Sequence, residues 1–233
     1  MNSFVLPDTQ QGRVVLGSRS PRRRELLNDV IGTSALIVCP PENSVEAGFD
    51  DVDDDDAIRQ RLLEIVRAKH DDVNQQRARL IELAEPSARR VVEWIIVADT
   101  TVVATRPCGR RIVLGQPPDQ HWQETVSGWF EHFLSGRIHD VLTGVIVSRG
   151  EQVIEFVQAT QVAFDVVSRD RLGRYLLTGE SVGKAGGYAI QGMAAGFVRS
   201  VQGSLTNVIG LPTSEVLEAL ERLGWTDSAA QSS

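Results

Sequence analysis

The chain has 233 residues, of which 42% are hydrophobic and 24% charged, and its formal net charge is −7. This length and apolar content suffice for a folded core, while the negative charge argues against nucleic acid or an anionic membrane as a partner. Two cysteines are too few for a disulfide framework or a four-cysteine zinc site, and no apolar run is long enough to cross a membrane. The first residues lack the basic and apolar regions of a secretory signal, so we expect a cytoplasmic protein.

Strand-like and helix-like patterns alternate along the chain. A strand at 14–16 ends in Gly17 and Ser18, and a helix is expected to follow it, because Ser20 is a good N-cap and Pro21 suits a first helical turn. Further strands are predicted at 35–38, 91–98, 102–104, 111–114, 138–148, 152–164 and 197–201. Further helices are predicted at 57–83, 122–134, 170–178 and 214–223. This alternation, with hairpins within it, predicts an α/β fold with a mixed sheet and flanking helices.

Three consecutive arginines lie at the predicted start of the first helix, in the segment 16-LGSRSPRRRELL-27. The helix dipole disfavours cations at this end, and a bound anion would relieve the repulsion. Free backbone N–H groups, serine hydroxyls and guanidinium groups all bind phosphate oxygens well. Successive helical residues are rotated by about 100°, so only one or two arginines can face a ligand, and Arg24 is expected to face solvent. A basic surface patch paired with nearby acids is the alternative.

Asp99 follows an apolar run in 97-VADTTVV-103, where it is predicted to lie at the end of a strand. A carboxylate in that position can hold a divalent cation or orient and deprotonate a water molecule. The alternative is an ordinary turn after a strand, in which Asp and Thr side chains bond to loop amides.

The glycine-rich segment 183-GKAGGYAIQG-192 would let the backbone approach a ligand closely. Lys184 could neutralise a phosphate, and the Gln191 amide could both donate to and accept from the edge of a base. The segment lacks the residue order of a Walker loop or a dinucleotide fingerprint. A mobile glycine loop is the alternative.

Two other features favour a structural interpretation. The acidic stretch 50–56 lacks the alternating ligands and central glycine of an EF-hand, so a solvated surface loop is favoured over a cation site. His139 has no serine or cysteine nucleophile pattern beside it, and we expect it to be structural.

Five segments occur in the order LGSRSPRRRELL, VADTTVV, SGRIHDVLTGV, GKAGGYAIQG and NVIGLP. Together they are similar to the Maf family of nucleotide pyrophosphatases, also described as septum-formation inhibitors, and the resemblance runs from Val14 to Leu223. It implies the fold of the inosine-triphosphate pyrophosphatases, a mixed twisted sheet whose two lobes flank a cleft. We therefore expect a single domain of two lobes at 13–225, with flexible tails at 1–12 and 226–233.

The resemblance also implies an activity. Members of the family hydrolyse a nucleoside triphosphate between its α- and β-phosphates, with Mg²⁺ or Mn²⁺, and are usually homodimers. The stretch GGYAIQG looks like the dTTP/UTP-type branch, whereas the 7-methyl-GTP branch differs there. The resemblance thus implies a homodimeric hydrolase that converts dTTP, UTP or modified nucleotides to the monophosphate and pyrophosphate.

Site residues can be carried over where the motifs match. Asp99 matches the catalytic acid, which accepts a proton from the attacking water and is also a metal ligand. The positions that match substrate-binding residues are Ser18, Arg22, Arg23, Lys69, Thr100, Lys184 and Gln191. The serine and the arginines would contact phosphates, and Thr100 and Gln191 are associated with the choice of base. Glu42 is the candidate for a second metal-linked carboxylate, and Glu46 is the fallback.

Two positions depart from the family pattern. Gln116, in 114-LGQPPD-119, stands where a lysine is usual, which removes a positive charge from a phosphate-facing position. Asn43 stands where the second acid of a pair is usual. A catalytically weak nucleotide-binding regulator of cell division is the alternative function and is consistent with the missing lysine. Direct nucleic-acid binding is opposed by the net charge and by an aromatic content of 6%.

Overall fold

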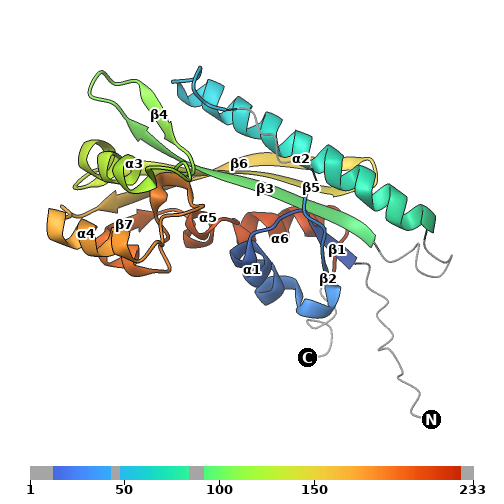
Figure 1. Ribbon diagram of the computed structural model, residues 1–233. Helices are drawn as coiled ribbons and strands as arrows, with labels where there is room; N and C mark the ends of the chain where they lie inside the picture. Colours follow the sequence, from blue (N-terminus) through green and yellow to red (C-terminus); the bar gives the residue numbers. More distant parts are fainter. Residues whose placement is uncertain (1–12, 43–47, 84–91, 227–233) are drawn as a thin grey trace, which may run out of the picture.

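A computed structural model describes residues 13–42, 48–83 and 92–226 (Figure 1). In these ranges seven strands form one sheet in the order β2-β1-β3-β5-β6-β7, and β4 pairs with β3 outside that order. The strands are β1 Arg13–Leu16, β2 Leu36–Val38, β3 Val92–Thr105, β4 Arg111–Leu114, β5 Ile138–Arg149, β6 Gln152–Phe164 and β7 Val198–Gln202. The helices are α1 Pro21–Ile31, α2 Asp55–Leu83, α3 Trp122–Trp129, α4 Arg169–Leu177, α5 Leu205–Ile209 and α6 Thr213–Arg222. Because β1 runs parallel to β2 and β3 while the other pairs are antiparallel, the predicted α/β fold with a mixed sheet is confirmed.

One edge of β3 is shared by two partners, whereas its other edge pairs with β5. Trp94 to Ile96 pair with β1, and Val102 to Thr105 pair with β4. Between these stretches, none of the strands in the described ranges pairs with that edge, although β5 remains paired opposite. The prediction that a strand ends at Ala98 is therefore wrong, because one continuous strand is paired with β5 as far as Val103 and with β4 as far as Thr105.

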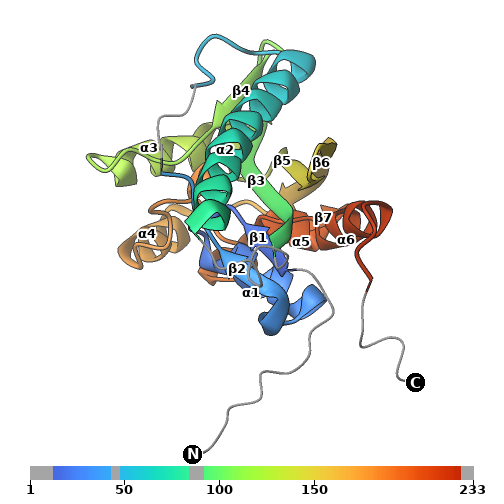
Figure 2. The same cartoon turned by 90° about the vertical axis from the view of Figure 1, so that its right-hand side faces the viewer.

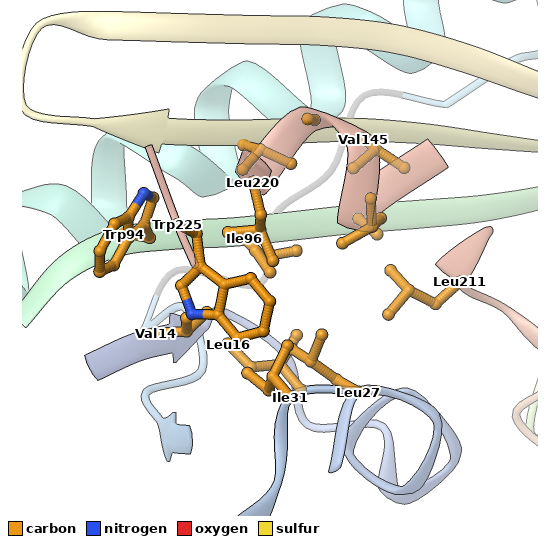
Figure 3. Close-up of a cluster of buried hydrophobic side chains, with 14 of the residues drawn as sticks. Val14, Leu16, Leu27, Ile31, Trp94, Ile96, Val145, Leu211, Leu220 and Trp225 are labelled. Atoms are coloured by element: carbon orange, nitrogen blue, oxygen red, sulfur yellow. The ribbon is translucent and has the colours of Figure 1, made fainter. Parts of the chain in front are cut away.

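The first half of β3 contributes to a core that it shares with α1 and α6. Trp94, Ile96 and Ala98 alternate along the strand, so their side chains lie on one face, and each is at most 4% exposed. Figure 3 shows Trp94 and Ile96 among side chains from β1, α1, β5, α6 and the residues that flank α6: Val14, Leu16, Leu27, Ile31, Val145, Leu211, Leu220 and Trp225. Full burial of one large apolar side chain is worth about 1.5–3 kcal/mol, so this cluster is a major source of stability.

The second half of β3 contributes to a separate core on the same face. Val102 and Ala104 pack there with residues of α3, α4 and the segment before β7. The centre is aromatic: the ring centroid of Phe130 lies 5.7–5.9 Å from those of Phe164, Tyr175 and Phe197. Figure 1 shows α3, α4 and β7 at the opposite end of the sheet from α1 and β2. Residues 98–102 of β3 thus lie where one core gives way to the other.

Helix α2 covers the opposite face of the sheet along both halves of β3 (Figures 1 and 2). Val73 packs against Ile95 and Val97, which alternate with the residues that face the first core. Nearer its start, the helix packs Ile58 and Leu62 against the second half of β3 and against β5. The helix agrees with the predicted span 57–83 and starts two residues earlier.

The glycine-rich segment before β7 is folded and partly buried. It forms two 3₁₀ turns, at Ala185–Gly187 and Met193–Phe197. Gly186 has φ +68°, and a Cβ there would lie 2.7 Å from Val102 Cγ2, so only glycine fits this contact with β3.

The acidic stretch 50–56 is held by arginines and by the start of α2. Salt bridges join Asp51 to Arg61 at 3.2 Å, Asp53 to Arg110 at 2.7 Å and Asp55 to Arg111 at 2.9 Å. The Asp54 carboxylate accepts the Ala57 N–H at 2.8 Å and so caps the helix. These bonds support the expected surface loop and leave the carboxylates engaged with arginines and amides.

Some predictions fall on other parts of the chain. The tail 1–12 and residues 227–233 of the other predicted tail lie outside the described residues, as do Asn43 and Glu46. Helix α5 was not predicted, and the predicted helix 122–134 is α3 followed by a π-helical turn at Phe130–Leu134. Among the helices of the described ranges, none combines the length and the apolar run needed to cross a bilayer.

His139 is buried in the aromatic core, as expected for a structural residue. It is 1% exposed, its Nε2 lies 2.8 Å from Tyr188 Oη, and its ring meets Phe164 edge-on at 4.9 Å. Burial lowers the pKa of the imidazole to about 4. The folded state therefore holds a neutral imidazole at pH values where the unfolded chain is already protonated.

Acid should destabilise the protein through this residue. Protonation favours the unfolded chain as pH falls from about 6.5 toward 4, and the stability lost by pH 4 should be about 3 kcal/mol. Urea unfolding across this range should show a smaller loss for His139→Gln than for the natural protein. His132→Gln, at an exposed histidine, is the control and should leave the loss unchanged. An identical loss in His139→Gln and the natural protein would contradict the assignment.

Candidate active site

A cleft of about 600 Å³ opens beside the unpaired stretch of β3. Its walls come from the start of α1, from α2 and β3, from the glycine-rich segment and from the turn after α5. Eight of the predicted site residues line it together: Ser18, Arg22, Arg23, Lys69, Asp99, Thr100, Lys184 and Gln191. Glu42 differs from these, because its neighbour Pro41 lines the cleft while Glu42 is an exposed residue outside the lining. Its backbone N–H donates to Asp72 Oδ1 at 3.1 Å.

The pleat of β3 directs Asp99 and Thr100 to opposite faces of the sheet. Asp99 shares its face with Ile95 and Val97 and therefore points toward α2. Thr100 shares the other face and therefore points toward α1 and α5. Because that edge of the strand is unpaired here, both side chains reach the cleft.

Asp99 is bonded to a lysine of α2. Lys69 Nζ donates to Asp99 Oδ1 at 2.6 Å, and the two side chains are 15% and 18% exposed. Gly144, the partner of Asp99 on β5, lets the helix come close, since a Cβ there would lie 3.0 Å from Leu62 Cγ. The close approach of α2 to β5 thus brings Lys69, further along the helix, within reach of the carboxylate.

Arg23 is anchored on the other side of β3. Its Nε donates to the Gly210 carbonyl at 2.8 Å, and one Nη donates to Thr100 Oγ1 at 2.9 Å. The other Nη lies 3.4 Å from Ser18 Oγ. These bonds join the first helix, the central strand and the turn after α5, so Arg23 has a fixed orientation at the cleft wall.

A buried polar network continues inward from Thr100. Its hydroxyl lies 3.0 Å from Thr143 Oγ1, which in turn donates to the Asn207 carbonyl at 3.4 Å. Asn207 Nδ2 donates to the Val141 carbonyl and to Thr160 Oγ1, both at 3.0 Å. Sequence reasoning assigned no role to Thr143 or Asn207. The available signal was their position in two of the five motifs, but the motif order does not reveal that the two segments touch.

Arg22 from α1 and Lys184 from the glycine-rich segment place two cations in the cleft. Arg22 Nε is buried without a hydrogen-bond partner. Burial lowers the pKa of the Lys184 ammonium, and the Arg22 guanidinium lowers it further. Arg24, by contrast, is exposed and is not among the cleft-lining residues, as the rotation of the helix predicts. Two cations that repel each other in this way form a site prepared for an anion.

Two glutamines complete the described wall. Gln191 and Gln116 are both exposed and both line the cleft. The Gly186 N–H donates to the Gly115 carbonyl at 3.0 Å and so joins the segments that carry them. Gln116 therefore presents an uncharged amide at the position where the family resemblance leads one to expect a lysine.

The donor set fits a metal that shares its coordination with a substrate. Within the described ranges, no three His, Cys, Asp or Glu residues gather as a closed metal site. Mg²⁺ is commonly held by one or two carboxylates together with substrate phosphate oxygens and water, and Asp99 in the cleft wall meets that requirement.

Comparison with known proteins gives consistent matches over almost the whole chain. A dTTP/UTP pyrophosphatase of Burkholderia thailandensis is 37% identical over 209 residues, which cover 89% of this chain and 91% of that protein. A protein of the same name from Anaeromyxobacter sp. is 37% identical over 218 residues, 91% of this chain and 90% of its own. A protein of this name from Cereibacter sphaeroides is 37% identical over 212 residues, which cover 91% of this chain and 95% of that protein. The family model described as Maf-like protein matches residues 13–223, and the chain belongs to this family.

Proposed function

We propose that this protein is a nucleoside-triphosphate pyrophosphatase that hydrolyses dTTP or UTP to the monophosphate and pyrophosphate. The observation that carries the proposal is the pair of cations, Arg22 and Lys184, in one cleft with the Asp99 carboxylate. A triphosphate brings several negative charges and would relieve the repulsion between the cations. The relatives named dTTP/UTP pyrophosphatase support the choice of substrate.

The two cations and the start of α1 would bind the phosphates. Arginine forms paired bonds to phosphate oxygens, and lysine contributes a compact positive charge. Ser20 caps the helix by accepting the Arg23 N–H, which fixes the turn that carries Arg22. Arg23 is already oriented by its bonds to Gly210 and Thr100, so its guanidinium is held in the cleft wall before the substrate arrives. Such preorganised donors stabilise the charge that develops on the departing pyrophosphate.

Asp99 would orient the attacking water and accept its proton. Lys69 holds the carboxylate through Oδ1, so the orientation of Asp99 is set before the substrate arrives. The proton passes from the water to the carboxylate as the water oxygen attacks phosphorus and the pyrophosphate oxygen departs. The role of Lys69 in this scheme is to position Asp99 and, with Arg22 and Lys184, to add positive charge near the phosphates.

A divalent cation, Mg²⁺ or Mn²⁺, would be held by Asp99 and the substrate phosphates. When bound, it would supply positive charge that neutralises the phosphates. Glu42 remains a proposed second carboxylate, since it follows Pro41 in the chain.

Gln191 is the residue we propose for recognition of the base. Its amide can donate one hydrogen bond and accept another at the mouth of the cleft, as a pyrimidine edge requires. Thr100 is less suited to this role, because its hydroxyl already meets Arg23 and Thr143.

The regulatory alternative is not favoured, because the relatives that match along the chain are named as enzymes. A homodimer and a single domain of two lobes at 13–225 remain proposals that rest on the family resemblance. A cytoplasmic location remains a proposal that rests on the sequence of the first residues. Gln116 leaves the cleft with one fewer cation than the family pattern, which should affect rate more than fold.

Asp99→Asn should abolish most of the activity while leaving the fold intact. The amide cannot accept a proton from water, and loss of such a base typically lowers kcat by about 10²–10⁴-fold. The measurement is pyrophosphate release from dTTP and UTP with Mg²⁺. Turnover by Asp99→Asn equal to that of the natural protein would refute the assignment.

Arg22→Ala and Lys184→Ala should weaken triphosphate binding. Loss of one charge-assisted contact corresponds to a rise in KM of about 10- to 100-fold. Arg24→Ala removes the same charge from the exposed face of the same helix turn and is the matched control, with an expected change below about threefold. Equal effects from the two arginine substitutions would mean that the site responds only to net charge.

Removal of divalent cations should stop pyrophosphate release. Dialysis against a chelator should abolish turnover, and added Mg²⁺ or Mn²⁺ should restore it, because phosphate charge would otherwise remain unneutralised. Addition of NaCl to the same ionic strength is the control and should not restore turnover. Unchanged turnover after chelation would exclude the proposed cation.

A further inference from the structure

Glu180 lies in the turn that follows α4 and contacts the glycine-rich segment, which forms part of the cleft wall. It is half-buried and is not among the cleft-lining residues, so its carboxylate does not face the nucleotide site directly. Its backbone N–H donates to Thr178 Oγ1 at 3.1 Å, which fixes where the side chain leaves the turn. A carboxylate that does not line the cleft acts on the site through the residues that it contacts.

The Glu180 carboxylate is bonded to the turn that carries Gln191. Oε2 accepts the Met193 N–H at 2.8 Å, two residues beyond Gln191. The carboxylate also lies directly against Gly192, where a Cβ would overlap it. On the other side of the turn, the Gly192 N–H donates to the Ala189 carbonyl at 3.2 Å. The exposed Gln191 thus lies on a short turn that the Glu180 carboxylate holds through Gly192 and Met193.

Glu180 also influences the other functional residue of the glycine-rich segment. Its negative charge raises the pKa of the Lys184 ammonium, in opposition to burial and to the Arg22 guanidinium. Oε1 is buried without a hydrogen-bond partner, so the bond through Oε2 to Met193 is the contact that holds the side chain against the turn.

We propose that Glu180 is a positioning residue for base recognition, which acts by holding the 191–193 turn so that the Gln191 amide meets the base in a fixed orientation. This inference rests on the proposed function, since it concerns how the same cleft selects a pyrimidine triphosphate. Gly192 is required for this contact, because only a residue without a side chain leaves room for the Glu180 carboxylate. The discrimination it governs is between bases that differ in the donors and acceptors of one edge, such as uracil and cytosine.

The test compares Glu180→Ala with Glu180→Gln. Both substitutions remove the negative charge and so change Lys184 in the same way, but the glutamine keeps an oxygen that can accept the Met193 N–H. Steady-state kinetics with UTP and CTP should show that the ratio of kcat/KM for the two falls about three- to tenfold in Glu180→Ala, mainly through KM for UTP. In Glu180→Gln the ratio should stay within about twofold of the natural value.

Gly192→Ala provides a second probe of the same contact. Gly192 has φ −106°, which alanine adopts without strain, so the substitution should act by displacing the carboxylate. The UTP-to-CTP ratio should fall as it does in Glu180→Ala. In the double variant it should fall no further than in Glu180→Ala alone, because the two changes break one interaction. Urea unfolding and hydrogen exchange of the Met193 amide, on the free proteins, check folding and the contact itself.

The proposal is overturned if Glu180→Ala keeps the natural UTP-to-CTP ratio of kcat/KM, or if it lowers activity on UTP and CTP equally. It is also overturned if the ratio falls in Glu180→Gln as much as in Glu180→Ala. A natural protein that releases pyrophosphate from no triphosphate would refute the proposed function instead. In that case, the Kd values of the α,β-methylene analogues of UTP and CTP are measured for the natural protein and for Glu180→Ala. A preference for one analogue that is lost in Glu180→Ala supports the role of Glu180, and equal affinities in the natural protein refute it.

Discussion

The unpaired edge of β3 between β1 and β4 is the constraint on which the cleft depends. A strand needs a partner to satisfy its backbone groups, and β5 supplies one along the whole central stretch. On the other edge the two partners leave a gap, so consecutive side chains of one strand reach the cleft. The pleat then sends Asp99 toward α2 and Thr100 toward α1, and each meets a different cation, Lys69 or Arg23.

Although the net charge of the chain is −7, five cationic side chains line the cleft: Arg19, Arg22, Arg23, Lys69 and Lys184. Individual hydrogen bonds hold several of these cations in place despite their mutual electrostatic repulsion. The bonds of Arg23 to the Gly210 carbonyl and to the Ser18 and Thr100 hydroxyls set its orientation at the cleft wall. Overall repulsion of anions and local attraction at the cleft together favour small, highly charged ligands over long polyanions.

Local chemistry made much of the fold predictable. Ser20 and Pro21 mark the start of α1, and the apolar periodicities locate α2, β5 and β6 within a few residues. The site residues were named from motif positions, and eight of them lie in one cleft. Their roles in catalysis and binding remain predictions, because position in a cleft does not by itself establish chemistry.

What escaped prediction depends on contacts between distant parts of the chain. Asp99 was expected at the end of a strand, because it follows the apolar run that stops at Ala98; only pairing with β5 reveals that the strand continues. The bond from Arg23 to Gly210 spans 187 residues, and no local pattern encodes it. Asn207 was hidden for the same reason, since a buried polar residue can be recognised only when its partners on β5 and β6 are known.

The unbroken pairing of β3 with β5 also limits how the molecule can move. The pairing of β3 with β5 is continuous from Trp94 to Val103 and so passes through both cores. Helix α2 packs against both halves of β3 on the opposite face. The two ends of the sheet are thus mechanically coupled and cannot swing about a flexible linker. Nucleotide entry and product release would then depend on small displacements of the loops that line the cleft. Loop motions take nanoseconds to microseconds, whereas hinge motions between domains are slower.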